Sequence, residues 1–239
     1  MFAGRPYGKG LAAQRDCPDI PYSLVEPSNL STNLSLLGRE IARWNDTFQE
    51  FQALASAGRL TADVVQRAEF GVDVLGIVQN NLQLGVCCLL LAVGPDDQVL
   101  GAMAYLIVPP TLLNGEMQGT IALLAVDPRN MPGSPHATQL RGVGTALVAA
   151  ASQRMIAVGA DVVYLHPLDA EARRFWVARG FRRCGGGGLL CVRGVDAIAA
   201  LIDGCLQSPE VPADGEFLLC GLPGRVRERL NGRRATVRA

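Results

Sequence analysis

The sequence predicts an α/β protein with a single mixed, mainly antiparallel central sheet flanked by helices. Three observations lead to this fold class. The first third of the chain has helical periodicity, short apolar runs separated by turn residues follow it, and the remainder alternates between helix and strand patterns. A chain of 239 residues with 49% hydrophobic residues can bury a sizeable core. The order helix, helix, hairpin, strand, helix, strand, helix, strand is typical of one sheet covered by helices.

The N-terminal residues 1–32 are rich in Pro, Gly, Ser and Asn and show no period, so we expect a flexible arm there. A helix is predicted over residues 34–57, where apolar side chains recur at steps of three and four: Leu37, Ile41, Trp44, Phe48, Phe51 and Leu54. Gly58 should end it. A second helix is predicted over residues 62–80 with Thr61 as its cap, although Gly71 and Gly76 disfavour helix.

The apolar runs at residues 85–93 and 98–108 predict a hairpin of buried strands, because turn residues separate them. A further strand is expected over residues 120–126, followed by an irregular loop. Patterns downstream predict a helix at 144–158, a strand at 161–168, a helix at 170–180 and a strand at 188–192. We therefore expect a core domain over residues 33–192 and a C-terminal extension over 193–239, with an apolar helix and an arginine-rich tail.

Composition excludes several classes of protein. The formal net charge is zero, so no overall field attracts nucleic acid or a membrane. The seven cysteines are scattered, only two histidines are present and no C-x-x-C spacing occurs, so no metal site is expected. The N-terminus has no apolar signal-peptide region, and no apolar run is long enough to span a bilayer. We expect a soluble protein that is cytoplasmic, or exported without a classical signal peptide.

Two glycines, Gly142 and Gly144, stand between a strand and an apolar helix. The first turn of a helix has backbone N–H groups without internal acceptors, and the helix dipole favours negative charge there. Glycines would let this backbone approach a pyrophosphate, and Arg141 would add a charge-assisted contact; the alternative is a helix entry with close packing. The Walker pattern is absent, and Leu147 stands where a dinucleotide fingerprint needs its third glycine.

Two motifs carry a family resemblance. The pattern Q/R-x-x-G-x-G/A is matched by Gln139, Gly142 and Gly144. The pattern A-x-x-F-aromatic-x-x-x-G-F is matched downstream by Ala172, Phe175, Trp176, Gly180 and Phe181. In this order and spacing they resemble the GCN5-related N-acetyltransferases (GNAT), over about residues 85–192. The resemblance implies the acyl-CoA N-acyltransferase fold, acetyl-CoA or another acyl-CoA as co-substrate, and no metal.

The resemblance also implies roles for particular residues. The strand before the loop would hydrogen-bond the pantetheine arm through the backbone of Leu124, Ala125 and Val126. The pyrophosphate would rest on the loop, which comprises Gln139, Leu140, Arg141, Gly142, Val143, Gly144 and Thr145. Asp169, Ala172 and Trp176 of the second motif complete the implied cofactor site. The next strand would diverge and leave a slot for the thioester, which a neutral amine attacks.

The sequence departs from the family at three positions. Many members have tyrosine where Trp176 stands, and that hydroxyl can protonate the leaving thiolate; an indole N–H cannot, so Trp176 would line the slot instead. Many members have asparagine where Asp169 stands, and aspartate caps a helix equally well. Some members carry a glutamate base on the strand before the loop. Here that strand has no acid: Glu116 lies upstream of it and Asp127 just beyond its end.

The proton-transfer groups are therefore sought elsewhere. His166 lies near the C-terminal end of the strand that borders the slot, where a neutral imidazole can accept the proton of the amine; the alternative is a packed or surface histidine. Tyr164 faces the same side if the strand is regular and is the best nearby hydroxyl, with Tyr105 as a weaker alternative. His136 lies in the long loop, which is either a lid or substrate contact or a surface insertion.

Two functions remain open from the sequence. The first is an acyl-CoA-dependent N-acetyltransferase acting on a primary amine of a protein, a small molecule or aminoacyl-tRNA. Some compact toxins of the family acetylate charged tRNA, and residues 165–176 resemble their second motif. The second is a catalytically silent acyl-CoA-binding or interaction module, such as a bacterial effector, which the missing tyrosine and base motivate. A homodimer is compatible with both; no membrane partner is expected.

Overall fold

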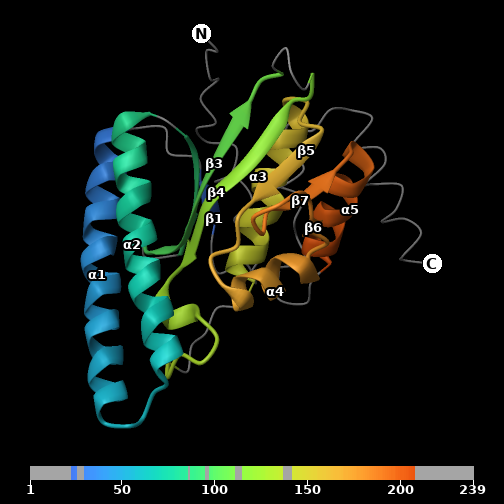
Figure 1. Cartoon of the computed structure of the whole chain (residues 1–239). Helices are drawn as coiled ribbons and strands as arrows, with labels where there is room; N and C mark the ends of the chain where they lie inside the picture. Colours follow the sequence, from blue (N-terminus) through green and yellow to red (C-terminus); the bar gives the residue numbers. More distant parts are fainter. Residues whose placement is uncertain are drawn as a thin grey trace, which may run out of the picture. The chain divides into compact units, whose positions relative to one another are not determined.

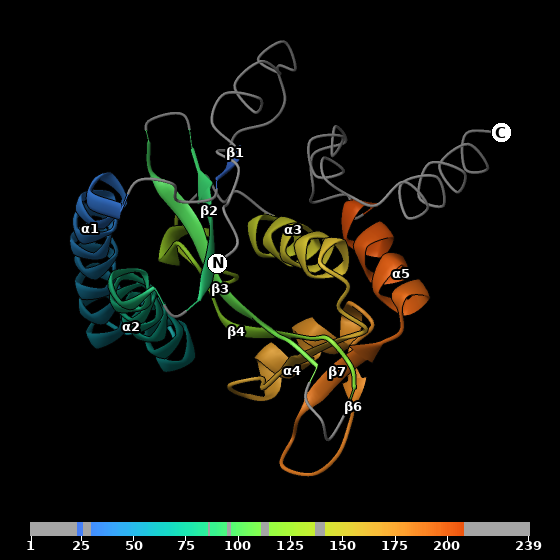
Figure 2. The same ribbon diagram turned by 90° about the horizontal axis from the view of Figure 1, so that it is seen from above.

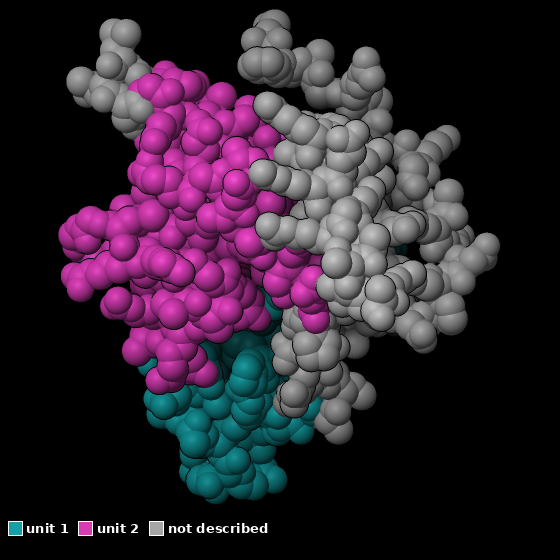
Figure 3. Space-filling model, turned by 90° about the vertical axis from the view of Figure 1, so that its right-hand side faces the viewer, with its two compact units in different colours: residues 1–104, 123–147 teal, residues 105–122, 148–239 magenta. Residues whose placement is uncertain are grey.

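The structure is a computed structural model that describes residues 23–25, 30–85, 87–94, 97–110, 115–136 and 142–207. It divides into two compact units, which Figure 3 colours separately. Unit 1 comprises residues 1–104 and 123–147, and unit 2 comprises residues 105–122 and 148–239. The predicted loop Gln139–Arg141 falls outside the described residues, as do the arginine-rich tail and most of the predicted arm.

Helices and strands alternate along the chain much as predicted (Figure 1). The helices are α1 (Leu30–Ser56), α2 (Ala62–Leu84), the 3-10 turn η1 (Pro128–Asn130), α3 (Val143–Ala157), α4 (Ala170–Ala178) and α5 (Val195–Leu206). The strands are β1 (Ser23–Val25), β2 (Cys88–Val93), β3 (Val99–Val108), β4 (Gln118–Val126), β5 (Val162–Leu165), β6 (Arg182–Arg183) and β7 (Leu190–Arg193). Their hydrogen-bonded order is β1-β2-β3-β4-β5-β7-β6. The pairs β1–β2, β5–β7 and β6–β7 are antiparallel, whereas β4–β5 is parallel. The predicted mixed α/β class is confirmed.

In unit 1, α1 and α2 pack side by side over the strands β2 and β3 (Figure 2). The core between them contains fully buried side chains from every layer: Leu37, Trp44, Val74, Leu75, Val78, Val99, Ala102 and Ala104. Gly71 lies buried within α2. A Cβ built there would stand 3.7 Å from the carbonyl oxygen of Val126 and 3.9 Å from the Trp44 ring, which is ordinary van der Waals contact.

A second apolar cluster lies in unit 1 at the ends of α1 and α2. It consists of Phe48, Phe51, Val64, Ala68 and Met131. Met131 directly follows η1, so this cluster fixes the segment that leaves β4 against both helices. The chain after the strand is therefore held by burial of apolar surface.

Three elements differ from the sequence prediction. Residues Ser23–Val25, inside the predicted arm, form β1 and pair with β2, where Leu24 is buried. The two-residue strand β6 was not predicted. The strand β5 ends at Leu165 rather than at 168. Its end is physically reasonable, because Pro167 has no N–H to donate to a neighbouring strand.

Unit 2 is built around β5 and β7. The helix α5 packs against both strands, and its apolar face buries Ile198, Leu201, Ile202 and Cys205. Residues 118–121 of β4 pair with β5 in parallel. On this part of β4, Gly119 lies under Met155 of α3: a Cβ at Gly119 would stand 2.4 Å from the Met155 sulfur. Among the described residues, no helix combines the length and apolarity that a membrane span requires.

We predict that Gly119→Ala destabilises the protein by about 1–3 kcal/mol, because the added methyl overpacks the contact with Met155. Urea unfolding followed by circular dichroism measures the change. Gly186→Ala is the matched control: nothing lies within 4 Å of its Cβ position, so a change of less than about 0.5 kcal/mol is expected. In a Met155→Ala background the cost of Gly119→Ala should shrink. An undiminished cost there would locate the strain elsewhere.

Candidate functional site

The predicted pyrophosphate loop enters α3 through Gly142, whose φ is +81°. The Gly142 carbonyl accepts the hydrogen bond of the Ala146 N–H at 2.8 Å, which makes Gly142 the residue that caps the helix. Residues with a side chain rarely adopt this backbone conformation, so the entry requires glycine. Gln139, Leu140 and Arg141, the other predicted contacts of this loop, lie outside the described residues.

The first turn of α3 packs directly against the strands of unit 1. A Cβ at Gly101 of β3 would stand 2.8 Å from Val143 Cγ1, 3.0 Å from Leu147 Cδ1 and 3.2 Å from the Ala125 carbonyl oxygen. Gly101 thus brings the start of the helix and the predicted pantetheine strand together. Of the predicted contacts in this unit, Ala125, Val143 and Thr145 are buried. Leu124, Val126 and Gly144 are half-buried.

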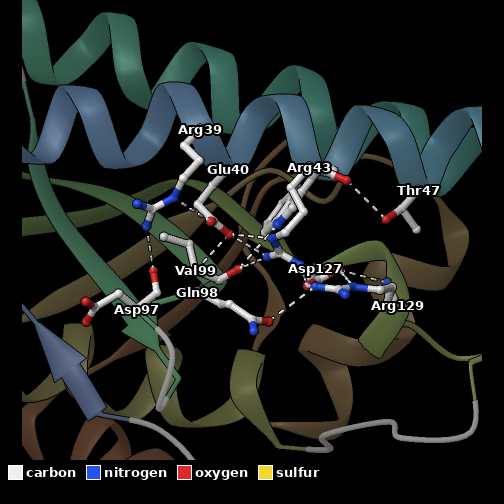
Figure 4. Close-up of polar contacts among 10 residues, drawn as sticks. Arg39, Glu40, Arg43, Thr47, Asp97, Gln98, Val99, Asp127 and Arg129 are labelled. Carbon is white, nitrogen blue, oxygen red and sulfur yellow. Dashed lines mark hydrogen bonds and ion pairs between the residues drawn. The ribbon is translucent and has the colours of Figure 1, made fainter.

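The end of β4 is fixed by Asp127, which is fully buried. Its backbone N–H donates to the Leu100 carbonyl at 2.9 Å. Its side chain caps η1 by accepting the Arg129 N–H at 2.9 Å, and it accepts from Arg43 Nη1 at 2.6 Å (Figure 4). Burial raises the pKa of Asp127 to about 6, while the charge and hydrogen bond of Arg43 lower it. Because this carboxylate is occupied by arginines, it serves as an anchor.

Arg43 of α1 is the centre of a polar network in unit 1 (Figure 4). It donates to Glu40 Oε2 at 2.7 Å and to the Val99 carbonyl at 2.8 Å. Glu40 Oε2 in turn accepts the Val99 N–H at 3.0 Å. Glu40 and Arg43 therefore satisfy both backbone groups of the first residue of β3, and the same arginine holds Asp127 at the end of β4. We call the set Glu40, Arg43 and Asp127 the anchor network.

The described part of the long loop after β4 is packed against helices. Arg67 of α2 donates to the Pro132 carbonyl at 3.3 Å. The His136 ring stacks on Phe51 with centroids 5.8 Å apart, and its Nε2 lies 3.5 Å from Glu50 Oε2. These contacts tie His136 to α1. Its predicted contact with substrate stays a prediction.

In unit 2, the hydroxyl of Tyr164 accepts a hydrogen bond from Arg193 Nη2 at 2.9 Å. Arg193 also forms an ion pair with Glu116. The hydrogen bond to Glu116, together with the charges of Tyr164 and Glu116, raises the pKa of Arg193. Because Arg193 is the donor, the Tyr164 O–H is not consumed by this bond. Glu116, which the sequence places upstream of the predicted pantetheine strand, is thus the ion-pair partner of Arg193.

His166 lies beyond the end of β5 and is exposed. The predicted shared face of Tyr164 and His166 depends on a regular strand, and the strand ends at Leu165, between them. The alternation of side chains therefore does not fix the direction of His166 relative to Tyr164. Both catalytic assignments stay predictions.

The second motif forms α4, and its cap is the predicted one. Asp169 Oδ1 accepts the Ala172 N–H at 2.6 Å. Trp176 is 6% exposed and meets Phe181 and Phe175 in edge-on contacts, with ring centroids 5.4 and 4.9 Å away. Trp176 is therefore part of the core of unit 2. Its predicted place along a thioester slot is not decided by these contacts.

Sequence reasoning missed the anchor network and Gly101. Glu40 and Arg43 lie among the periodic apolar positions of α1, one turn apart, and a charged pair on the buried face of a helix is a signal for such a network. Gly101 gave no signal beyond a glycine inside an apolar strand, which can mark close backbone approach. Within the described residues, no cluster of three or more His, Cys, Asp or Glu side chains is placed to hold a metal ion.

We predict that Arg43→Met lowers the free energy of unfolding by about 3–5 kcal/mol near pH 8, because it removes the cation that the two buried carboxylates Glu40 and Asp127 share. Methionine keeps the apolar stem of the side chain. Arg39→Met is the control: that side chain is 61% exposed and pairs with the same Glu40, so a loss below about 1 kcal/mol is expected. Urea unfolding followed by tryptophan fluorescence measures both.

The loss from Arg43→Met should also depend on pH. The folded-state pKa of Asp127 lies above its unfolded value, so protonation favours the folded state and stability falls as the pH rises from about 4 to about 6. Without Arg43 the folded pKa rises further, and stability should keep falling above pH 6. The deficit of the variant is therefore smaller near pH 5 than near pH 8. Equal deficits would show that Asp127 is not the group involved.

No family model and no curated protein matches the chain. Among solved structures, the chain is similar to a mutant AtaT toxin bound to the C-terminus of the antitoxin AtaR, with 22% identity over 52% of this chain and 76% of that chain and a TM-score of 0.42. It is similar to AtaTR bound with acetyl-CoA, with 23% identity over 52% and 76% and a TM-score of 0.41. It is also similar to a candidate acetyltransferase from Exiguobacterium sp. 255-15, with 16% identity over 73% and 94% and a TM-score of 0.42. These TM-scores and identities are too low for the likenesses to carry an argument about the activity of this chain.

Proposed function

We propose that the chain is an acyl-CoA-dependent N-acetyltransferase that transfers an acetyl group from acetyl-CoA to a primary amine. The observation that carries the proposal is the entry to α3. Gly142 adopts φ +81° and caps the helix at the position where the family pattern places the pyrophosphate. This backbone needs glycine, and it leaves no Cβ between the loop and an anion.

The residues of unit 1 fit an acyl-CoA donor. The N-terminal turn of α3 offers backbone N–H groups and the positive end of a helix of 15 residues to a pyrophosphate. Gly101 and the anchor network hold this turn and the end of β4 in place. Leu124, Ala125 and Val126 would meet the pantetheine arm through their backbone. The bound acyl-CoA supplies the thioester; the chain binds and orients it.

The transfer step requires a deprotonated amine, stabilisation of the oxyanion and a proton for the leaving thiolate. We assign the acid to Tyr164. Its hydroxyl is oriented by Arg193, and as the acceptor in that bond it keeps its own proton for donation. We assign the acceptance of the amine proton to His166, which is exposed to solvent just past β5. The acceptor is a primary amine of a protein, a small molecule or aminoacyl-tRNA.

A second function, a catalytically silent acyl-CoA-binding module, is favoured by one observation. Trp176 stands where many family members have a tyrosine hydroxyl, and it is locked between Phe175 and Phe181. An indole at this position binds and packs but cannot protonate a thiolate. Asp127, the acid nearest the end of β4, is held by Arg43 and Arg129. A protein of this kind would bind acyl-CoA without turnover.

We predict that Gly142→Glu weakens acetyl-CoA binding by at least about a hundredfold, because it places an unpaired carboxylate beside the pyrophosphate. Isothermal titration calorimetry measures the affinity. Gly142→Ala is the matched variant: it introduces the same strain at φ +81° without a charge and should bind more tightly than the glutamate variant. Wild-type affinity in a folded Gly142→Glu protein would exclude this loop as the donor site. A wild-type chain that binds no acyl-CoA would exclude both functions.

We predict that Tyr164→Phe lowers kcat by about 10²–10⁴-fold while acetyl-CoA affinity stays unchanged, as expected for loss of a general acid. CoA release is followed with lysine peptides, small amines and charged tRNA as acceptors. Trp176→Tyr is the companion variant. It should leave turnover near that of the wild type if Tyr164 is the acid, and it should create turnover if the chain is a silent module. Full activity of Tyr164→Phe would remove Tyr164 from the mechanism.

A further inference from the structure

Two cysteines of unit 2 flank a glycine-rich hairpin. The strands β6 and β7 pair in antiparallel register with Arg182 opposite Cys191 and Arg183 opposite Leu190. Cys184 continues the pairing, since its N–H donates to the Leu189 carbonyl at 3.1 Å. This backbone bond keeps Cys184 in register with β7 beyond the last residue of β6, so the alternation of side chains places Cys184 on the face of Arg182 and Cys191. The two thiols are diagonal neighbours across the hairpin.

The thiols also interact. The Cys184 thiol lies 3.9 Å from the Leu189 carbonyl oxygen. Desolvation, followed by the hydrogen bond and the charge of Cys191, raises the pKa of Cys184 to about 11. This effect of Cys191 agrees with the placement of both side chains on one face of the hairpin. Cys191 is buried and Cys184 is partly exposed, so an oxidant can reach the pair through Cys184.

The backbone of the hairpin loop has room to adjust so that a disulfide can form. Diagonal partners in a sheet lie farther apart than the Cβ spacing of a disulfide, so some backbone adjustment is needed. Residues 185–188 are all glycine, and the Cβ position of each has no heavy atom within 4 Å. Gly185, Gly187 and Gly188 have positive φ. The space around these Cβ positions leaves room for the adjustment.

We propose that Cys184 and Cys191 form a cross-strand disulfide when the protein meets a low-molecular-weight disulfide such as oxidised glutathione. The Cys184 thiolate attacks one glutathione sulfur, the glutathione S–S bond breaks, and the first glutathione leaves and takes up the proton that Cys184 gave up. The Cys191 thiolate then attacks the Cys184 sulfur of the mixed disulfide. The second glutathione leaves with the proton of Cys191. Two protein thiols are oxidised, and one glutathione disulfide is reduced to two thiols.

Arg193 favours the first attack. Its charge lowers the pKa of Cys184 against the raising effects of burial and Cys191. The guanidinium is held on this face by Glu116 and by the Tyr164 hydroxyl. The exchange should accelerate with pH, because the thiolate is the attacking species and the pKa of Cys184 lies well above neutrality. Between about pH 7 and 9 the rate should rise close to tenfold per pH unit.

The test uses the full-length reduced protein in glutathione buffers of increasing oxidised fraction. Free thiols are blocked with N-ethylmaleimide, and trypsin then releases residues 184–193 as one peptide, because Arg183 and Arg193 flank it. This peptide contains Cys184 and Cys191 and no other cysteine. Mass spectrometry therefore distinguishes two maleimide adducts, glutathione adducts and an internal disulfide, which is two hydrogen masses lighter than the dithiol. The same titration on protein unfolded in guanidinium measures what the short loop achieves alone.

We expect the internal disulfide to form in the folded protein at a reduced-to-oxidised glutathione ratio at least about tenfold more reducing than in the unfolded chain. Cys205→Ser, which removes a buried cysteine of the same unit, should leave this midpoint unchanged. Cys191→Ser should stop the reaction at the glutathione adduct of Cys184. An equal midpoint in folded and unfolded protein would overturn the proposal, as would a peptide that carries only adducts in wild-type protein.

Discussion

The ion pair between Arg43 and Asp127 is the interaction on which the predicted donor site depends. Asp127 directly follows β4, where the segment towards α3 begins, and it is fully buried. A buried carboxylate is tolerated only when it is paired and hydrogen-bonded. Arg43 supplies the pairing, and the Arg129 N–H supplies a further bond. Because the same arginine bonds the Val99 carbonyl, one side chain of α1 sets both the start of β3 and the end of β4.

Close packing by glycine places α3 on this frame. In unit 1, Val143 and Leu147 of the first helical turn pack against Gly101. In unit 2, Met155 of the last turn packs against Gly119. A side chain at either glycine would push the helix away from its strand by overpacking. The start of the helix at Gly142 is therefore set by two things: the packing of the first turn against Gly101, and the backbone conformation of Gly142 itself. The loop conformation and the packing of the helix are therefore one constraint.

The sequence predicts the long elements well and the short ones badly, for physical reasons. The apolar period of α1, with Trp44 and Phe51 at core positions, repeats over enough turns to be unambiguous. Strand β1 has three residues and β6 has two, too few for any period, and both exist because a neighbouring strand offers backbone partners. The anchor network was invisible as a whole, since Glu40 and Asp127 are far apart in sequence. The end of β5 before His166 was also missed, and it decides whether alternation can relate that histidine to Tyr164.

The residues proposed for donor binding and those proposed for proton transfer belong to different units. The glycine cap, the first turn of α3 and the anchor network all belong to unit 1, whereas Trp176, Tyr164 and Arg193 belong to unit 2. Each group is stabilised by contacts within its own unit: arginine–carboxylate pairs in the first, and edge-on aromatic packing with the Tyr164–Arg193 bond in the second. Trp176 contributes edge-on packing against Phe181, but an indole N–H cannot supply the proton that a tyrosine hydroxyl can. Under the proposed function, the tryptophan at position 176 leaves the predicted donor residues of unit 1 unchanged, and the proposed acid, Tyr164, is oriented by Arg193 and not by Trp176.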